Sequence, residues 1–587
     1  MSSTVKNRFA NLLLDLALTS KSWLHRAQLA RAIRDPMKTQ RAVLAQILRV
    51  NRGTRFGREY DFASITDERT YRQRVPVHDY EALRPYVDAQ IDSGERALTH
   101  EAPAYYLRTS GTTGRAKDIP LTLTHLRQLQ RTQGRSVAAQ HRRHRAAFGG
   151  SILAIAGAAT EGHLANGRPF GSASAVVAGS SPALVRDKFV LPDQVSDITD
   201  SRLKYLLILR LAIARGDLRY LGTANPSTLL ALMAIYRDNE TALIADLRNG
   251  GFFAQHSVPV DVLSVLGPRL RADPERADEL ERLRAIAKDG AGERLRIADL
   301  WPQLRLVVTW TCASAGIALA ALREELPRHT RIHELGYLSS EFMGTVTLGL
   351  RAGSGVLTYD THYFEFVERE QWDDGAPQFL ALDELRKGHD YYVLVTTPSG
   401  LYRYFINDLI RVTGIVRRMP LVTFLQKGKG VTNITGEKLY ESQLLDAVAI
   451  VMGEMGLLAL FVMALADETA RQYRLYIEPQ RTSGVGCALG DVQALAAQVD
   501  QHLQLTNIEY RAKRESARFE PLCAFWLRAG TETAFRQACV AQGQREGQFK
   551  TVALSYRAQL TFDLDACVAP SDGSLPHPID QGEANRR

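Results

Sequence analysis

The sequence predicts an α/β protein with a large N-terminal domain of layered β-sheets and helices, followed by a smaller α+β domain. Its 587 residues exceed what a single hydrophobic core accommodates, so at least two domains are expected. From residue 104 to about 425, short β-like runs alternate with helical ones. A glycine–lysine segment at 426–430 follows an apolar run and is typical of a hinge. We therefore expect a large domain over 1–426, a small domain over 427–566 and a disordered tail over 567–587.

The predicted elements follow one another in a simple order. Residues 1 to about 100 carry helical patterns separated by turn signals, for example at 51–57. Apolar and β-branched runs then predict strands at 151–156, 304–310 and 391–397. The stretch 271–293 alternates charges densely and predicts an exposed helical insertion.

The composition is that of a soluble globular enzyme, with 45% hydrophobic residues, 23% charged residues and a net charge of +9. No apolar run reaches the ~20 residues of a membrane-spanning helix. Residues 1–26 mix charged residues with leucines and lack a cleavage site, which favours an amphipathic helix packed on the body over a signal peptide or membrane anchor. The basic cluster His141–Arg145 lacks interleaved aromatic residues, which favours a solvated helix end over a nucleic-acid surface. We expect neither a nucleic-acid nor a membrane partner.

The five cysteines are scattered, and none forms a C-x-x-C pair. This usage is typical of a reducing compartment and argues against a structural metal site, so we expect a cytoplasmic protein. The pair His333-Glu334 resembles the start of a zinc-binding helix, but Tyr337 occupies the place of the second histidine. We therefore reject a zinc site.

The most informative segment is a loop rich in hydroxyl side chains and glycine. It follows an apolar-aromatic run and comprises Thr109, Ser110, Gly111, Thr112, Thr113, Gly114, Arg115, Ala116 and Lys117. A strand that leads into such a loop offers backbone N–H groups and hydroxyl donors to a polyphosphate. It is not a Walker loop, because Lys117 comes three residues after Gly114 and Asp118 replaces the magnesium-binding Ser or Thr. A plain Thr/Gly-rich turn is the alternative interpretation of this segment.

A second motif, Tyr337-Leu338-Ser339-Ser340-Glu341, lies where a strand is expected to end. The carboxylate of Glu341 could supply a hard oxygen ligand to Mg²⁺. The ring of Tyr337 could stack on a base. The pattern is equally compatible with an ordinary helix cap.

Two further motifs contain a charged residue that could contact a nucleotide, Asp408 in one and Lys550 in the other. Asn407-Asp408 lies between two apolar runs, which predicts a turn or strand junction. A carboxylate there could accept both hydroxyls of a ribose, as in dinucleotide sites, although closure of an Asx-type turn explains it equally well. Lys550 ends the segment Gly547-Gln548-Phe549-Lys550 ahead of an apolar run, and a lone lysine of this kind is ordinarily solvated surface.

Together these motifs resemble the adenylate-forming superfamily of acyl-CoA synthetases, peptide-synthetase adenylation domains and luciferases. More closely, the chain resembles the Gretchen Hagen-type acyl-acid amido synthetases, the auxin- and jasmonate-conjugating family with bacterial relatives. The resemblance covers nearly the whole chain. The matching segments are 51–57, 75–80, 109–120, 225–230, 337–341, 364–366, 401–414, 436–438 and 547–550. Several independent motifs in one order are far more specific than any one of them.

The resemblance implies a site for Mg·ATP between a large domain and a small domain that closes over it. The loop Ser110–Gly114, flanked by Thr109 and Lys117, would bind the ATP phosphates. Tyr337 would flank the nucleotide, together with Ser339 and Ser340.

Four charged residues complete the implied site. Glu341 would bind Mg²⁺ and Asp408 would hold the ribose hydroxyls. Lys427 would contact the nucleotide, and Lys550 would reach the α-phosphate or the acyl carboxylate after closure. Glu341 and Lys550 are thus the catalytic residues that the resemblance implies.

The sequence departs from the family pattern at three positions. Asn407 stands where many relatives have Gly before the Asp, and Leu338 replaces a small residue. Lys427 stands where family members commonly carry Arg, and lysine lacks the bidentate fork of arginine. We expect altered local geometry at the first two positions and a weaker ribose or phosphate contact at the third.

The activity implied by the resemblance is that of an AMP-forming acid–amino acid ligase. ATP and Mg²⁺ are the implied cofactors, and a small carboxylic acid and an amine are the implied substrates. A thioester-forming ligase acting on coenzyme A or a carrier protein is one alternative. A nucleotide-binding regulator without turnover is an alternative of another class.

Overall fold

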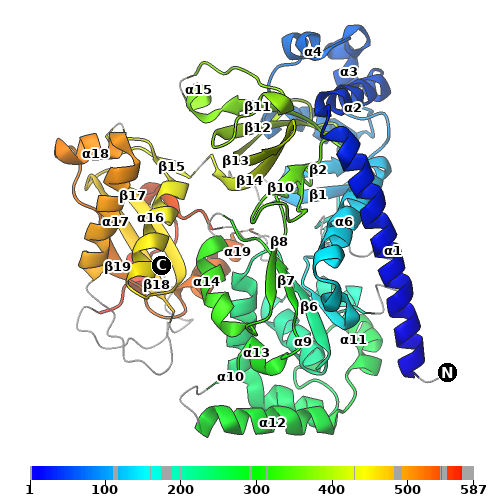
Figure 1. The fold of residues 1–587 in the computed structure, drawn as a ribbon, viewed down its shortest axis with the longest axis vertical. Coiled ribbons are helices and arrows are strands. Elements are labelled where there is room, and N and C mark those ends of the chain that lie inside the picture. The colour runs from blue at the N-terminus through cyan, green and yellow to red at the C-terminus, as the bar shows by residue number, and fades with distance from the viewer. Residues whose placement is uncertain are drawn as a thin grey trace.

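A computed structural model describes the structure of most of the chain (Figure 1). The described residues are 3–109, 117–158, 160–172, 188–198, 200–289, 294–312, 315–373, 375–428, 430–435, 437–480, 492–542, 544 and 551–570. Among them, no helix combines the length and apolar character needed to cross a membrane.

The N-terminal part is helical, as predicted. Its helices are α1 (Ser3–Ala32), α2 (Pro36–Asn51), α3 (Arg55–Glu59), α4 (Glu68–Arg74) and α5 (Tyr80–Asp92). Asp35, Asp67 and Asp79 cap α2, α4 and α5 by accepting hydrogen bonds from first-turn amides. Thr54 caps α3 in the same way, within the predicted turn at 51–57.

A four-stranded parallel sheet forms the centre of the large domain. Its order is β3 (Ser151–Ala154), β6 (Leu218–Gly222), β7 (Leu306–Thr309) and β8 (Arg331–Glu334). Buried side chains of these strands share a core with the helices α9 (Ser201–Ile213), α10 (Ser227–Asn249), α11 (Val260–Leu266), α13 (Ile297–Leu300) and α14 (Ala315–Glu325). The predicted strands at 151–156 and 304–310 are therefore confirmed.

The charged stretch 271–293 forms the helix α12 (Pro274–Asp289), as predicted, but it is not simply an exposed insertion. Ala277 and Leu280 are fully buried, and α12 packs against α10. The sparse apolar positions within this charged sequence are thus the contact face of the helix.

Two further sheets complete the large domain. An antiparallel sheet has the order β11 (Tyr363–Glu368), β12 (Asp390–Thr396), β13 (Tyr404–Val416), β14 (Met419–Lys427), β10 (Gly355–Leu357) and β9 (Thr345–Val346). The other sheet has the order β2 (Lys117–Leu121), β1 (Tyr105–Thr109), β5 (Pro169–Gly171) and β4 (Gly162–His163). The short helix α15 (Arg369–Asp373) follows β11, and α6 (Leu123–Arg143) follows β2. The strand predicted at 391–397 is β12.

The C-terminal part has its own α+β core and lies beside α14 (Figure 1). Its sheet has the order β19 (Cys523–Trp526), β18 (Gln472–Pro479), β17 (Ala459–Asp467) and β20 (Leu554–Tyr556). The short strands β15 (Val431–Thr432) and β16 (Leu439–Tyr440) precede it. Its helices are α16 (Glu441–Glu454), α17 (Val492–Thr506), α18 (Ile508–Glu515) and α19 (Thr531–Ala541). This arrangement confirms the prediction of a smaller α+β region that follows the large domain in the sequence.

Helix α1 runs along one side of the large domain and packs against α6 (Figure 1). The prediction of a helix packed on the body is confirmed, because Leu14 and Leu18 are buried. The interpretation of His141–Arg145 as a solvated helix end is only partly right. His141 is buried, and its Nε2 lies 3.0 Å from the Asp15 carboxylate, which also pairs with Arg145.

A buried ion network fixes the start of β13. Glu365 on β11 is 1% exposed and accepts hydrogen bonds from Arg403 Nε at 3.0 Å and Arg72 Nε at 2.9 Å. Arg403 is itself buried, has a left-handed φ of 42°, and donates to the Val75 carbonyl at 2.8 Å. The network therefore joins the N-terminal helices to the strand that carries Asp408.

We expect Glu365→Ala to destabilise the large domain by about 3–5 kcal/mol, because it leaves the Arg403 charge buried without its carboxylate. Differential scanning calorimetry should show an apparent Tm lower by several degrees. The matched control is Glu368→Ala on the same strand, whose partners Arg386 and His389 are 62% and 40% exposed. Its cost should stay within about 1 kcal/mol. Equal Tm shifts in the two variants would contradict this role for the network.

Candidate active site

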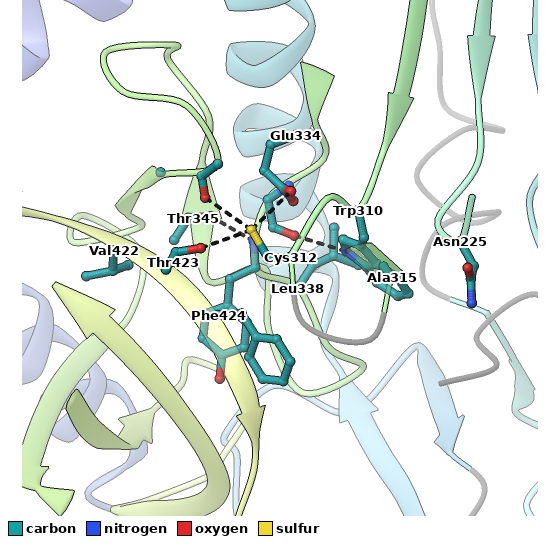
Figure 2. A pocket seen from close by; sticks show the side chains of 14 residues that line it. Asn225, Trp310, Cys312, Ala315, Glu334, Leu338, Thr345, Val422, Thr423 and Phe424 are labelled. Carbon is teal, nitrogen blue, oxygen red and sulfur yellow. Dashed lines mark hydrogen bonds between the residues drawn. The ribbon is translucent and has the colours of Figure 1, made fainter. Parts of the chain in front are cut away.

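The candidate site lies at the carboxyl edge of the parallel sheet, where ligands bind in open α/β folds. Asn225 follows β6, Trp310 and Cys312 follow β7, and Gly336–Leu338 follow β8. These residues line a pocket whose opposite wall comes from β14, at Val422–Phe424 (Figure 2). The enclosed part of the pocket is small, about 50 Å³, and it opens into a wider mouth.

Glu334 organises the inner wall of the pocket. Its Oε2 accepts a hydrogen bond from the Thr311 amide at 2.7 Å, and its Oε1 accepts one from the Gly336 amide at 2.8 Å. The carboxylate thus ties the loop after β7 to the turn after β8. Burial raises the pKa of the Glu334 carboxyl above its usual value.

The Cys312 sulfur lies at the centre of the same wall (Figure 2). It is 3.1 Å from Thr423 Oγ1 and 3.6 Å from Glu334 Oε2. Burial, reinforced by the neighbouring Glu334, raises the pKa of the thiol to about 11. Cys312 is therefore a neutral packing residue rather than a reactive thiolate.

Asp408 is the most deeply buried carboxylate of the site, at 1% exposure. Strand pairing places it directly opposite Lys427, and Lys427 Nζ lies 2.9 Å from Asp408 Oδ1. The Tyr337 hydroxyl donates to Asp408 Oδ2 at 2.8 Å. Burial alone would lower the pKa of Lys427, but the carboxylates of Asp408 and Glu341 outweigh it and raise the pKa.

The prediction of a turn or strand junction at Asp408 is wrong, because the residue lies inside β13. The turn-like pattern comes from Asn407, which has a left-handed φ of 57° within the strand. Asparagine tolerates this conformation better than most residues, so it can replace the Gly expected before the Asp. A Cβ at Gly428 would lie 1.9 Å from Asn407 Oδ1, so any other residue there would displace the Asn407 side chain.

Tyr404 connects two site residues that the sequence alone does not bring together. Its hydroxyl donates to Glu341 Oε1 at 3.4 Å, and Lys117 Nζ donates to the same hydroxyl at 3.4 Å. Lys117 begins β2, immediately after the hydroxyl-rich loop. Lys117 and the Glu341 carboxylate therefore meet at one point of the site. Burial, followed by the nearby Glu341, raises the pKa of Tyr404 well above its usual value, so it is a neutral donor.

The ring of Tyr337 is buried and lines the pocket. It stacks on Phe424 with centroids 5.6 Å apart and contacts Phe342 edge-on at 5.4 Å. Ser339 forms the following turn, since its amide donates to the Phe342 carbonyl at 3.0 Å. Ser340 and Glu341 complete that turn, with Ser340 half-buried and Glu341 buried.

Several predicted site residues lie outside the described part of the chain. The structure describes the backbone of Thr109 at the end of β1 but not its side chain. Ser110, Gly111, Thr112, Thr113 and Gly114 lie outside the described residues, as does Lys550. The four cysteines within the described ranges are free, and these ranges contain no cluster of three or more acidic, histidine or cysteine side chains that could hold a metal.

The residues present fit a magnesium–nucleotide complex. Mg²⁺ is bound in nucleotide sites by one or two carboxylates plus substrate phosphates, so the Glu341 carboxylate suffices without a protein cage. Asp408 is a buried carboxylate held by Lys427 and Tyr337, which suits hydroxyl groups rather than a metal. Lys117 and Lys427 supply two positive charges beside these carboxylates.

Comparisons with known proteins identify the family of this chain. The GH3 family N-terminal domain matches residues 25–330, the GH3 family central domain 355–427 and the GH3 family C-terminal domain 442–559. The indole-3-acetic acid-amido synthetase GH3.4 of Arabidopsis thaliana is 24% identical over 582 residues, covering 93% of this chain and 94% of that protein. The 4-substituted benzoates-glutamate ligase GH3.12 of the same plant is 23% identical, covering 86% and 90%.

The solved structure of the GH3.15 acyl acid amido synthetase superposes with a TM-score of 0.79 at 22% identity, covering 94% of this chain and 98% of that one. This similarity extends through both the large and the small domain. The three family matches together span more than four-fifths of the sequence. The chain belongs to the GH3 family.

Proposed function

We propose that the protein is an AMP-forming ligase that activates a carboxylic acid with ATP and transfers the acyl group to an amine, with an amino acid as the expected acceptor. The relatives described above include an indole-3-acetic acid-amido synthetase and a 4-substituted benzoates-glutamate ligase. A solved GH3.15 structure holds 2,4-DB, a small acid. We place the reaction in the cytoplasm, as the cysteine usage indicates.

The observation that carries the proposal is the grouping of two buried carboxylates at the carboxyl edge of the sheet, one paired with Lys427 and the other linked to Lys117 through the Tyr404 hydroxyl. Asp408, held by Lys427 and Tyr337, is positioned to accept the ribose hydroxyls. Glu341, hydrogen-bonded by Tyr404, is positioned to hold Mg²⁺. When bound, the metal neutralises charge on the phosphate oxygens.

The first half-reaction needs positioning more than covalent chemistry from the protein. An oxygen of the substrate carboxylate attacks the α-phosphorus of ATP, and the bond to the pyrophosphate oxygen breaks. The products are acyl-AMP and pyrophosphate. Lys117, next to the hydroxyl-rich loop, and Lys550 in the small domain stabilise the negative charge that develops on the phosphates.

In the second half-reaction, the small domain turns about the hinge near 427–430 and admits the amine. The neutral amine nitrogen attacks the acyl carbon, the bond to the AMP oxygen breaks, and the nitrogen loses a proton. The products are an amide, AMP and a proton. No covalent enzyme intermediate is formed.

Mass spectrometry of reactions with ATP, a panel of carboxylic acids and a panel of amino acids should show an amide product. Conjugation should increase with pH through the ionisation range of the amine, because only the deprotonated nitrogen is nucleophilic. Reactions that contain coenzyme A instead of amines serve as the comparison. Robust acyl-CoA formation with no amide from any amine would replace this proposal with a thioester-forming ligase.

A further inference from the structure

We propose that the groove between α1 and α6 binds a second small molecule, an amphipathic carboxylate, at a site separate from the nucleotide pocket. A cavity of about 450 Å³ lies between these helices and the edge of the antiparallel sheet. This volume falls within the range of small-molecule sites. The groove shares no lining residue with the pocket around Cys312.

The walls of the groove are apolar. Leu29 of α1 and Ile33, which follows the helix, line the groove together with Leu348, Val356 and Met419 of the antiparallel sheet and its connecting loop. An alkyl or aryl group placed there would be removed from water, which stabilises binding by about 25 cal/mol per Å² of apolar surface.

Two arginines line the groove without a carboxylate partner. Neither Arg26 of α1 nor Arg142 of α6 forms an ion pair with any residue that the structure describes. Both side chains are exposed at the groove, and partial burial with the charges of Arg26 and Arg143 lowers the pKa of Arg142. By contrast, Arg135 in the same groove is neutralised by Asp360 at 2.7 Å. A carboxylate between Arg26 and Arg142 could pair with both guanidinium groups.

A buried histidine supplies an independent indication of a polar ligand. His25 lines the groove, is 7% exposed, and has no hydrogen-bond partner among the described residues. Burial, with the charge of Arg135, lowers its pKa to about 4, so the imidazole is neutral at pH 7 and one ring N–H can donate. A ligand carboxylate in the groove could accept that hydrogen bond in place of water.

The geometry also brings the groove next to the nucleotide pocket. Gly355 lines the pocket around Cys312, where the nucleotide is proposed to bind, and Val356 lines the groove. Both residues belong to β10. Successive residues of a strand point to opposite faces, so β10 is the wall between the two sites. The proposed ligand is therefore adjacent to the site of adenylation without occupying it.

Isothermal titration with decanoate, without ATP or amine, tests the proposal independently of the ligase activity. We expect saturable binding that weakens about tenfold or more when Arg26 and Arg142 are both replaced by alanine, because two charge-assisted contacts are lost. The matched control is Arg131→Ala, an exposed arginine of α6 that does not line the groove. Decan-1-ol, which lacks the charge, should bind more weakly than decanoate.

Crystals soaked with 10-bromodecanoate should place the bromine between α1 and α6 by its anomalous scattering. The proposal is overturned if decanoate shows no saturable binding or if the double variant binds it as well as the native chain does. Bromine located only in the pocket around Cys312 would equally overturn it. Arginine-dependent binding to vesicles of anionic phospholipid without binding of decanoate would instead identify the groove as a membrane contact and reject the small-molecule site.

Discussion

Replacing Glu341 with glutamine should lower acid-dependent ATP–pyrophosphate exchange by about 10²-fold or more while leaving the fold intact. The substitution preserves the volume and the acceptor for the Tyr404 hydroxyl at 3.4 Å. It removes the one negative charge that the proposed metal site takes from the protein. We therefore expect the variant to need a higher Mg²⁺ concentration to recover any activity.

Glu324→Gln on the exposed face of α14 is the matched control and should exchange pyrophosphate as the native enzyme does. Circular dichroism and the thermal midpoint establish that both variants are folded. Activity of Glu341→Gln within a few-fold of the native enzyme would remove Glu341 from the metal site.

Lys550→Ala should depress acyl-AMP formation by about 10²-fold or more, because the lysine supplies positive charge only in the first half-reaction. Amide formation from added acyl-AMP should change much less. Although Lys550 lies outside the described residues, the chain three residues later is anchored near the hinge. The Ala553 amide donates to Glu441 Oε1 at 3.0 Å, and the Glu441 amide donates to the Gly430 carbonyl at 2.7 Å.

Separate assays of the two half-reactions make this test specific. Lys513→Ala, on α18 of the small domain, is the control for general loss of positive charge and should leave both half-reactions unchanged. If Lys550→Ala reduces both half-reactions equally, or neither, the lysine does not have the proposed role.

Local patterns were sufficient to predict the order of elements. The strands β3, β7 and β12 are short, apolar and bounded by turn signals, so their positions follow from sequence periodicity. The sequence predicts the helix α12 but not its buried face. Most residues around Ala277 and Leu280 are charged, so the pattern indicates an exposed helix. Tertiary packing decides the exposure of such a helix, and a charge pattern alone does not report it.

The site was harder to predict because its contacts join segments far apart in the chain. Asp408 and Lys427 are brought together by the register of β13 and β14, which is set by the two-residue turn at Arg417 and Arg418 and by the irregularities within the strand pair. The sequence indicated that both residues matter, but not that they form a pair. Lys427 contacts the Asp408 carboxylate directly, although a lysine ammonium cannot form the two parallel hydrogen bonds of an arginine guanidinium.

The sequence alone does not assign a place in the candidate site to Tyr404 or Glu334. Tyr404 was part of a recognised motif, but nothing in the motif indicated that its hydroxyl would join Lys117 to Glu341. Glu334 was considered only as part of a zinc motif and rejected. Its position as the last residue of β8 could have indicated a place in the site, because the carboxyl ends of parallel strands surround the ligand site in such folds.

The central claim is most directly tested by ATP–pyrophosphate exchange with the native enzyme, measured without any amine across a panel of aryl, indole and fatty acids. The account predicts exchange that depends on at least one acid and on Mg²⁺, with AMP rather than ADP as the nucleotide product once an amine is added. ATP binding without exchange for any acid, or release of inorganic phosphate in its place, would contradict it.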